Sequence, residues 1–376
     1  MTFIQQIDLS SRKEVGEFLQ LPYRLYRAAP QWVPPVEADI RRMLDPSRHP
    51  FYRHSPAAFF LARRQAHQPP AARLAVLFHH PYNRHNRERT AFFYLFEAEE
   101  DEDLVKSLFA AGEKWAREQG ADRMIGPKGF SPFDALGVLV KGFEHRPAFG
   151  IPYNLPGYPA LLEACGFQPG EEILSGYLSG KAEFPAKIHQ IAERVMQKRG
   201  FQVARLRSRA DLRRLIPRLS EMYNRAIMNT PGNAPVDSAE VQSVLRQVLF
   251  FADLKLIKIL LKGDQPIGFL LAYPDISAAL QRTRGRLLPL GWLDWWLELK
   301  RTPWLNINGM GIVEEYRGLG GTAILFSEMR KSIQSGRFQH VEIVQIGAEN
   351  ERMLRELRDL GVDFYKAHRL YHKPLV

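Results

Sequence analysis

The sequence is poor in cysteine. Cys165 is the one cysteine among 376 residues, so the chain can form no internal disulfide and offers no set of thiolates for a metal site. This composition fits a reducing compartment, and we expect a cytoplasmic protein. Within the segment LLEACGF, Cys165 is expected to be a small buried apolar residue rather than a nucleophile.

Long apolar runs are also missing, and we expect no secretory signal. No apolar run reaches the roughly 18 residues that a membrane span needs. The opening MTFIQQIDLSSRKEVGEF lacks the apolar block and small-residue cleavage site of a signal peptide. Hydrophobic residues make up 45% of the chain, which excludes a disordered protein, and the length predicts two domains.

Negative charge is in deficit. The chain has 52 Lys and Arg against 41 Asp and Glu, a net charge of +11 that favours nucleic acid, anionic lipid or a polyphosphate cofactor as partner. The basic residues are dispersed over segments such as RRM, RSRADLRR and QRTRGR, which is typical of a solvated positive surface. The sequence has no recognition-helix, zinc-finger or RNP-type signature, and so no specific nucleic-acid motif.

The order of predicted elements occurs twice. AAFFLARRQAHQPPAARLAVLF predicts two strands and a turn, TAFFYLFEAEED a third strand, and DEDLVKSLFAAGEKWAREQG a helix. LKLIKILLKGDQPIGFLLAY, PWLNINGMGIV and TAILFSEMRKSIQSG repeat this order, with Gln265-Pro266 expected at the turn as Gln68-Pro69 is in the first copy. A duplicated α/β unit joined near residues 177–187 explains the repeat, and we predict domains over 1–180 and 181–376.

The segment GIVEEYRGLGGTAILF, residues 311–326, places an arginine and three glycines between a short strand and a helix. Such a turn lets the backbone approach a ligand and leaves N–H groups free, and the ligand is often a phosphate. The first half has EAEEDED at the corresponding place, and these carboxylates repel a phosphate. We therefore expect an anionic ligand in the second half only.

Other glycine-rich turns fit this segment less well. A P-loop needs a lysine after its glycines, and none follows Gly320-Gly321. Gly318, Gly320 and Ala323 satisfy the dinucleotide pattern G-x-G-x-x-G/A, but polar EEYR precedes them and too few residues follow for a Rossmann domain. A plain helix cap needs one glycine and no arginine.

The segment VEEYRGLGGTAIL resembles the pyrophosphate turn of the GNAT acyltransferase superfamily, written Arg/Gln-x-x-Gly-x-Gly/Ala after the fourth strand. Arg317 and Gly320 match in register, and Thr322 replaces the last Gly/Ala. Asn350 and Gly361 match the companion motif, an asparagine that opens the next helix and a glycine that ends it. The segments LYRAAPQWVPPVEADIRRMLDPSRHPFY, GPKGFSPFDALGVLVKGF, YNLPGYPALLEACGF and GRLLPLGW resemble a tandem form of the superfamily found in bacterial proteins.

The resemblance implies an α/β (α+β) fold of two tandem GNAT-like domains, each with a mixed, mostly antiparallel twisted sheet flanked by helices. It implies that the C-terminal domain binds acetyl-CoA or a longer acyl-CoA, while the N-terminal domain is degenerate. Its cofactor-binding residues are then Ile312, Val313, Arg317, Gly318, Leu319, Gly320, Gly321, Thr322 and Asn350. The N–H groups of the turn would hold the pyrophosphate, Arg317 would add charge, and the pantetheine arm would lie beside the preceding strand.

The resemblance also implies transfer of the acyl group to an amine. In many GNAT enzymes a tyrosine four residues before the helix-ending glycine protonates the departing thiolate, but Leu357 stands there, and Leu162 in the first half. Tyr365 is the candidate substitute acid. Asn350 either orients the pantetheine or a water, or caps its helix, and Glu349 is either a base or a solvated residue.

The acceptor is expected to bind between the halves, as a small-molecule or lipid amine, since some related proteins are thought to transfer long acyl chains to amino lipids. Loops of the first half offer candidate acceptor-binding residues, which could instead be structural: Ser131, Asp134, Tyr153 and Asn154. No histidine spacing predicts a metal site.

Residues 285–301, GRLLPLGWLDWWLELKR, combine tryptophan and leucine with flanking Arg and Lys. The pattern suits a peripheral membrane contact, a lid over an acyl chain, or a helix packed on the core. Two alternatives to an enzyme stay open. The missing tyrosine indicates a non-catalytic acyl-CoA-binding sensor or scaffold, and the positive charge would serve an aminoacyl-tRNA-dependent transferase on the related tandem fold.

Overall fold

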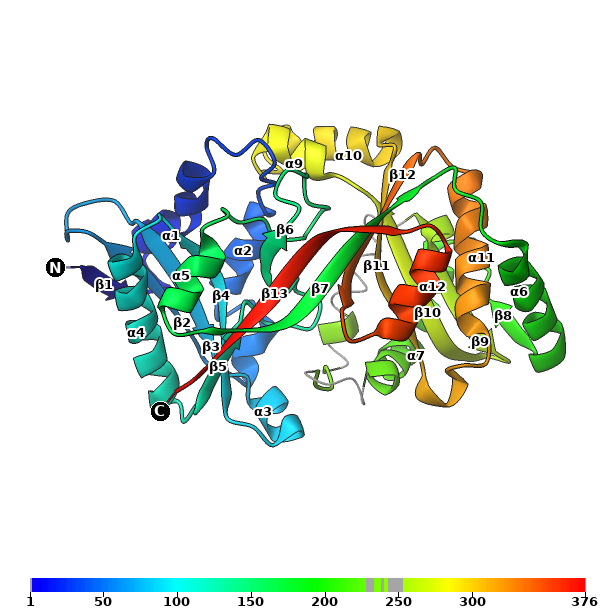
Figure 1. The fold of residues 1–376 in the computed structure, drawn as a ribbon, viewed down its shortest axis with the longest axis horizontal. Coiled ribbons are helices and arrows are strands. Elements are labelled where there is room, and N and C mark those ends of the chain that lie inside the picture. Colours follow the sequence, from blue (N-terminus) through cyan, green and yellow to red (C-terminus); the bar gives the residue numbers. More distant parts are fainter. Residues whose placement is uncertain (1, 228–232, 238–239, 243–252, 376) are drawn as a thin grey trace.

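The computed structural model describes residues 2–227, 233–237, 240–242 and 253–375 (Figure 1). The elements of the first half are β1 (Phe3–Gln6), α1 (Arg12–Leu25), α2 (Glu37–Met43), η1 (Pro50–Arg53), β2 (Ala57–Arg63), β3 (Ala72–Leu77), α3 (His80–Asn86), β4 (Thr90–Ala98), α4 (Glu102–Glu118), β5 (Arg123–Gly126), β6 (Val138–Lys141), α5 (Tyr158–Ala164) and β7 (Gln168–Ser179). The elements of the second half are α6 (Ala186–Arg199), β8 (Phe201–Val203), α7 (Arg209–Ile227), η2 (Leu254–Leu256), β9 (Ile257–Lys262), β10 (Gln265–Pro274), α9 (Ser277–Thr283), α10 (Gly291–Arg301), β11 (Trp304–Ile312), η3 (Glu314–Tyr316), α11 (Gly321–Gln334), β12 (His340–Gly347), α12 (Glu351–Asp359) and β13 (Asp363–Pro374).

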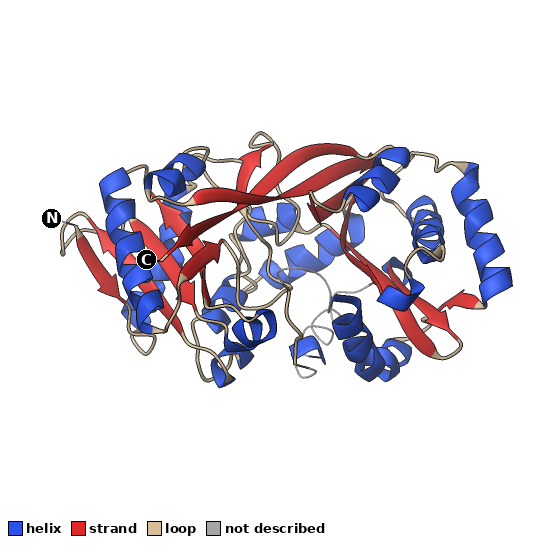
Figure 2. Ribbon diagram, turned by 60° about the horizontal axis from the view of Figure 1, so that its bottom comes forward, coloured by secondary structure: helices blue, strands red, loops and turns tan. Residues whose placement is uncertain are grey.

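The strands of both halves belong to one twisted sheet, with helices on both of its faces (Figures 1 and 2). The strand order is β1-β2-β3-β4-β5-β13-β7-β12-β11-β10-β9-β8, and β6 pairs with β13. Most neighbours are antiparallel. The parallel pairs β4–β5 and β11–β12 occupy equivalent places in the two halves.

The two halves repeat each other in register at these parallel pairs. β4 pairs with β5 over Thr90–Phe92, and β11 pairs with β12 over Trp304–Ile307. Five residues after the first paired position, each strand has a residue with positive φ, Leu95 at 50° and Gly309 at 113°. This correspondence supports the duplicated α/β unit that the sequence predicts.

The two halves exchange their last strands. β7 pairs with β12, where Ser179 lies opposite His340, and β13 pairs with β5, where Tyr371 lies opposite Gly126. β7 and β13 also pair with each other and run side by side through the middle of the molecule (Figure 1). One sheet for each half was expected, whereas the exchange joins both halves in a single sheet. The predicted boundary at residue 180, between β7 and α6, stays a prediction.

Apolar clusters fill the space between the sheet and its helices. In the second half, Leu305, Ile307 and Val341 pack toward α6 and α11, while a separate cluster lies under α7. Cys165 is buried as expected, and burial raises the pKa of its thiol to about 11. The turn expected at Gln265-Pro266 is wrong, because Lys262 pairs with Gln265 and β10 has already begun there. No helix in the described ranges is long and apolar enough to cross a bilayer.

Candidate functional site

The glycine-rich segment forms the turn between β11 and α11. β11 ends at Ile312, η3 follows, and α11 begins at Gly321. Gly318 and Gly320 have φ angles of 75° and 90°, in the left-handed region that glycine adopts without steric cost. Gly320 is the N-cap residue, and no side chain caps the helix.

Glycine also allows close packing on one side of this turn. A Cβ at Gly320 would lie 2.6 Å from Val195 in α6, and a Cβ at Gly321 would lie 2.8 Å from Leu260 in β9. A Cβ at Gly318 would meet only the guanidinium of Arg352, at 3.7 Å. The turn is therefore held against the protein at residues 320 and 321, and it is open at residue 318.

The N–H groups of residues 318 to 323 have no acceptor oxygen among the described residues. Ile324 is the first residue to donate to a turn carbonyl, that of Gly320, at 3.4 Å. These N–H groups lie at the positive end of a helix of 14 residues. Free N–H groups and the helix dipole together attract an anion.

Arg317 holds the turn in place instead of standing free beside it. Its Nε donates to the carbonyl of Ile312 at 3.0 Å, and its Nη2 donates to the carbonyl of Ala226 at 2.6 Å. The cation nearest to Gly318 is instead Arg352 of α12, an exposed side chain whose Nε donates to Glu356 at 3.1 Å. Sequence reasoning missed Arg352; its position two residues after Asn350 was the available signal.

β11 and β12 part before they end. Their pairing stops at Ile307 and Ile343, although β11 continues to Ile312 and β12 to Gly347. The N–H of Val313 donates to β10, at 2.9 Å, so the alternation of an antiparallel pair turns the N–H of Ile312 toward the β12 side. Within the described ranges, an unpaired strand edge therefore leads up to the glycine turn.

The equivalent place in the first half is closed by the protein's own groups. Asp101 caps α4, because its carboxylate accepts a hydrogen bond from the N–H of Leu104 at 3.1 Å, and it also pairs with Arg64 at 3.1 Å. The hydroxyl of Tyr158 accepts from the N–H of Ala98 at 2.8 Å and donates to the carboxylate of Glu97 at 2.9 Å. Tyr158 thus uses the strand edge that corresponds to Ile312 in the second half.

Comparison with known proteins identifies the architecture. No family model matches the chain. The "Bacterial ceramide synthase" of Caulobacter vibrioides is 25% identical over 98% of this chain and 97% of its own length, and "Protein YghO" of Escherichia coli is 24% identical over 100% and 95%. The tandem GNAT protein from the clavulanic acid biosynthesis pathway covers 100% of this chain and 99% of its own, at 12% identity and a TM-score of 0.58. This chain has the tandem GNAT fold.

A second solved structure agrees with this assignment. The GCN5-related N-acetyltransferase from Sphaerobacter thermophilus covers 100% of this chain and 96% of its own, at 13% identity and a TM-score of 0.52. The expected fold class is therefore confirmed. At the position of the usual GNAT tyrosine, Leu357 and Leu162 are 1% and 0% exposed and belong to the apolar core.

A group of mostly buried polar residues lies near the point where β11 and β12 part. Lys366 and Glu342 form an ion pair at 2.7 Å with side chains 1% and 2% exposed, and burial raises the pKa of Glu342. Burial and the nearby Glu342 carboxylate raise the pKa of the Tyr365 phenol, which makes it a weaker acid. Asn306 lies opposite Glu342 in the β11–β12 pair, and neither polar atom of its buried amide has a hydrogen-bond partner in the described residues.

The other two predicted catalytic residues lie at the start of α12. Asn350 caps this helix, since its Oδ1 accepts from the N–H of Met353 at 3.2 Å. Glu349 is exposed and folds back over Gly347, where a Cβ would lie 2.1 Å from the Glu349 carboxylate. Both residues are exposed, whereas Tyr365 lies among the mostly buried polar residues near Glu342, so the three residues do not form one group.

The predicted acceptor-binding residues are engaged by nearby groups of the first half. The N–H of Ser131 donates to Asp134 at 2.9 Å, and burial raises the pKa of that carboxyl to about 6. Asn154 accepts from the N–H of Leu139 at 2.6 Å and donates to its carbonyl at 3.2 Å. Tyr153 donates to a carbonyl of its own loop at 3.3 Å. These contacts give Asn154 and Asp134 a structural role in loop geometry, and acceptor binding by the set stays a prediction.

The loop that carries Ser131 reaches the second half. The side-chain amide of Gln345 in β12 accepts from the N–H of Leu136 at 3.1 Å and donates to its carbonyl at 2.9 Å. Phe133 lies against Tyr223 of α7, with ring centroids 5.0 Å apart. The first half therefore packs beside the stretch where β11 and β12 part.

A cavity of about 160 Å³ lies beside this loop, and residues of both halves line it. Ser131 lines it, and its other polar side chains are His54, His79, Tyr82, Lys128, Asn233, Asp237 and Glu240. His54 contacts Glu240 at 3.3 Å and stacks on His79 with ring centroids 5.4 Å apart. No cluster of His, Cys, Asp and Glu within the described ranges could hold a metal ion.

Proposed function

We propose that the second half binds an acyl-coenzyme A and transfers its acyl group to an amine held between the halves. One observation carries the proposal: free N–H groups at the start of α11 stand beside an unpaired edge of β11. The first half provides an internal comparison, because there Asp101 and Tyr158 close the equivalent positions.

The turn and its neighbours offer a place for each part of the donor. The N–H groups of residues 318 to 323 suit the diphosphate, with Arg352 as the nearest cation. The N–H of Ile312 suits an amide of the pantetheine arm, which would extend along β11. Arg317 then acts as a positioning residue, because it ties the turn to β11 and α7.

The reaction joins the amine nitrogen to the thioester carbonyl and breaks the carbon–sulfur bond. The nitrogen loses a proton and the thiolate gains one, so the products are an amide and the free thiol. Asn306 is a candidate to bind a reacting group, because an unpartnered buried amide is a group that a substrate can satisfy. Glu342 is a candidate proton acceptor, because burial raises the pKa of its carboxyl.

A long-chain acyl donor and a lipid amine are the substrates we favour. The relative named a bacterial ceramide synthase is similar to 98% of this chain. A ceramide is the N-acyl product of a long-chain amine. The proposal therefore predicts tighter binding as the acyl chain lengthens.

Calorimetry with acetyl-, octanoyl- and palmitoyl-coenzyme A tests the donor site. Arg352→Glu should weaken binding of each donor on the order of tenfold, because it places a negative charge beside the phosphates. Arg355→Glu, the same change three residues along the exposed surface of α12, is the matched control and should bind as the wild type does. Equal affinity of the two variants, or no binding of any donor, would contradict the proposal.

Binding without turnover is the second candidate, and the buried Leu357 favours it. Thiol release is measured with palmitoyl-coenzyme A and a panel of amines that includes a long-chain amino alcohol. Release that depends on the amine supports the transferase. Donor binding with no release under any amine supports the sensor or scaffold, and salt-sensitive tRNA binding in place of donor binding supports the tRNA-dependent alternative.

A further inference from the structure

Exposed large apolar side chains are concentrated in one segment. Eight such side chains are exposed among the described residues, and six of them lie between residues 288 and 297. They are Leu288 (78% exposed), Leu290 (69%), Trp292 (53%), Leu293 (40%), Trp296 (48%) and Leu297 (39%). A patch of this kind on a folded protein marks a surface that contacts an apolar partner.

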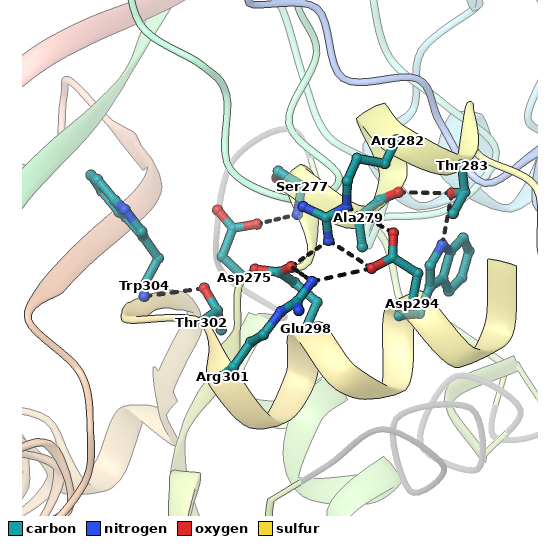
Figure 3. Close-up of polar contacts among 11 residues, drawn as sticks. Asp275, Ser277, Ala279, Arg282, Thr283, Asp294, Glu298, Arg301, Thr302 and Trp304 are labelled. Carbon is teal, nitrogen blue, oxygen red and sulfur yellow. Dashed lines mark hydrogen bonds and ion pairs between the residues drawn. The ribbon is translucent and has the colours of Figure 1, made fainter.

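The inner face of this segment is firmly attached to the protein. Trp295 is 2% exposed and donates through its indole N–H to Thr283 at 3.0 Å. Arg282 of α9 and Arg301 of α10 both pair with the two carboxylates of α10, Asp294 and Glu298 (Figure 3). The segment is therefore a fixed part of the surface rather than a core helix displaced outward.

The outer face of α10 is apolar because of its helical spacing. Trp292, Leu293, Trp296 and Leu297 occur at intervals of three and four residues and lie opposite the buried Trp295 and Glu298. Both α9 and α10 lie at one edge of the molecule, at the top of Figure 1. The apolar side chains thus point away from the fold.

Two cations flank the exposed apolar residues in the chain, Arg284 before them and Lys300 after them. Lys300 lies over the ring of Trp296 at 3.5 Å, and Arg284 lies over the ring of Tyr23 at 5.3 Å. Neither side chain pairs with a carboxylate in the described ranges, whereas Arg282, Arg286 and Arg301 are all ion-paired. The charge that is free to act on a partner at this face is therefore positive.

We infer that the outer face of α10, with residues 288–290, docks on the surface of an anionic lipid bilayer. Tryptophan and leucine on one helix face, with cations at its border, are the arrangement that lies flat at the headgroup level of a membrane. A lysine stem packed along Trp296 can reach the headgroups while the ring enters the interface. This inference does not depend on the acyl-CoA proposal.

Cosedimentation with vesicles tests the inference. The full chain should bind vesicles made of equal parts phosphatidylglycerol and phosphatidylcholine. Its affinity for vesicles of pure phosphatidylcholine should be at least about tenfold lower. Arg284→Glu with Lys300→Glu, and separately Trp292→Glu with Trp296→Glu, should each lower binding about tenfold or more. Phe3→Glu, at an exposed aromatic residue in β1, is the matched control and should bind as the wild type does. Wild-type binding by the tryptophan variant would overturn the inference.

Fluorescence locates the contact without relying on a charge-changing variant. Brominated lipid should quench the tryptophan emission of the wild type, and Trp292→Phe with Trp296→Phe should retain vesicle binding while most of that quenching is lost. Binding with undiminished quenching would place the contact elsewhere and overturn the inference. Light scattering tests whether a second copy of the chain covers this face instead. If the wild type is a dimer that does not bind vesicles, and Trp292→Glu with Trp296→Glu makes it a monomer, the face belongs to a second copy of the chain.

Discussion

Gly318→Asp is the sharpest perturbation of the proposed donor site. Gly318 is exposed, has a φ of 75°, and faces only the Arg352 guanidinium. Aspartate and asparagine adopt this left-handed conformation more readily than other side chains do. The variant therefore folds, with an expected loss of about 1 kcal/mol in the free energy of unfolding. It also brings a carboxylate to this turn, as Asp101 does at the start of α4 in the first half.

The expected loss of affinity follows from charge. A new carboxylate about 5 Å from a doubly charged diphosphate costs about 2 kcal/mol at the dielectric of water, which is roughly thirtyfold in Kd. Pairing of the new carboxylate with Arg352 would add to this loss, because it neutralises the nearest cation. Gly318→Asn has the same shape without the charge, and it should weaken donor binding less than about threefold.

Calorimetry with two ligands separates the charge effect from damage to the fold. Palmitoyl-coenzyme A should bind the aspartate variant roughly thirtyfold more weakly than the asparagine variant at low salt, with the difference shrinking as salt is added. Palmitoyl-pantetheine has no phosphate, so it should bind the two variants equally. The reasoning is refuted if both variants bind the coenzyme A ester equally, or if the pantetheine ester shows the same difference.

Two further predictions concern buried ionisable side chains. Lys366→Met leaves Glu342 buried without its cation and should lower the free energy of unfolding by about 3–5 kcal/mol. Adding Glu342→Gln should restore more than half of that loss. Urea midpoints measure both changes, and a double variant whose loss equals the sum of the two single losses would contradict the pairing. Burial lowers the pKa of His79 to about 3, below the 6.5 of an ordinary histidine, so the unfolded chain binds the proton first and stability falls as the pH drops from about 6.5. His79→Asn can keep the hydrogen bond that His79 accepts from the N–H of Tyr82. It should reduce the slope of the unfolding free energy against pH, between pH 4 and 6, by roughly 1 kcal/mol per pH unit. An unchanged slope would show that His79 does not titrate in this way.

Much of the local structure follows from short-range pattern. The alternating apolar runs give β9 to β11, and the helical spacing with Gly120 and Gly336 gives α4 and α11, because these signals depend on neighbours a few residues apart. The expectation of a turn at Gln265-Pro266 was wrong. Gly263 and Asp264 already reverse the chain, so Gln265 begins the next strand, Pro266 lies within it, and the likeness to Gln68-Pro69 is accidental.

The candidate site was also predictable only in part from the sequence. The glycines of the turn were predictable, since positive φ and free N–H groups are local properties of such a segment. The role of Arg317 was not, because its donors are satisfied by carbonyls of Ile312 and of Ala226, which lies 91 residues away in the chain. Arg352 and Asn306 were missed for the same reason, since their neighbours come from other elements.

By itself the sequence determined that two similar α/β units follow each other, that the second carries a glycine turn suited to an anion, and that the first carries carboxylates in its place. These are properties of composition and spacing, and they persist wherever the elements are placed. Only the tertiary structure decided that β7 and β13 change partners, that Arg352 lies beside Gly318, and that the outer face of α10 is exposed. Each depends on which distant segments meet, and a strand edge or an apolar helix face is compatible with several partners until packing selects one.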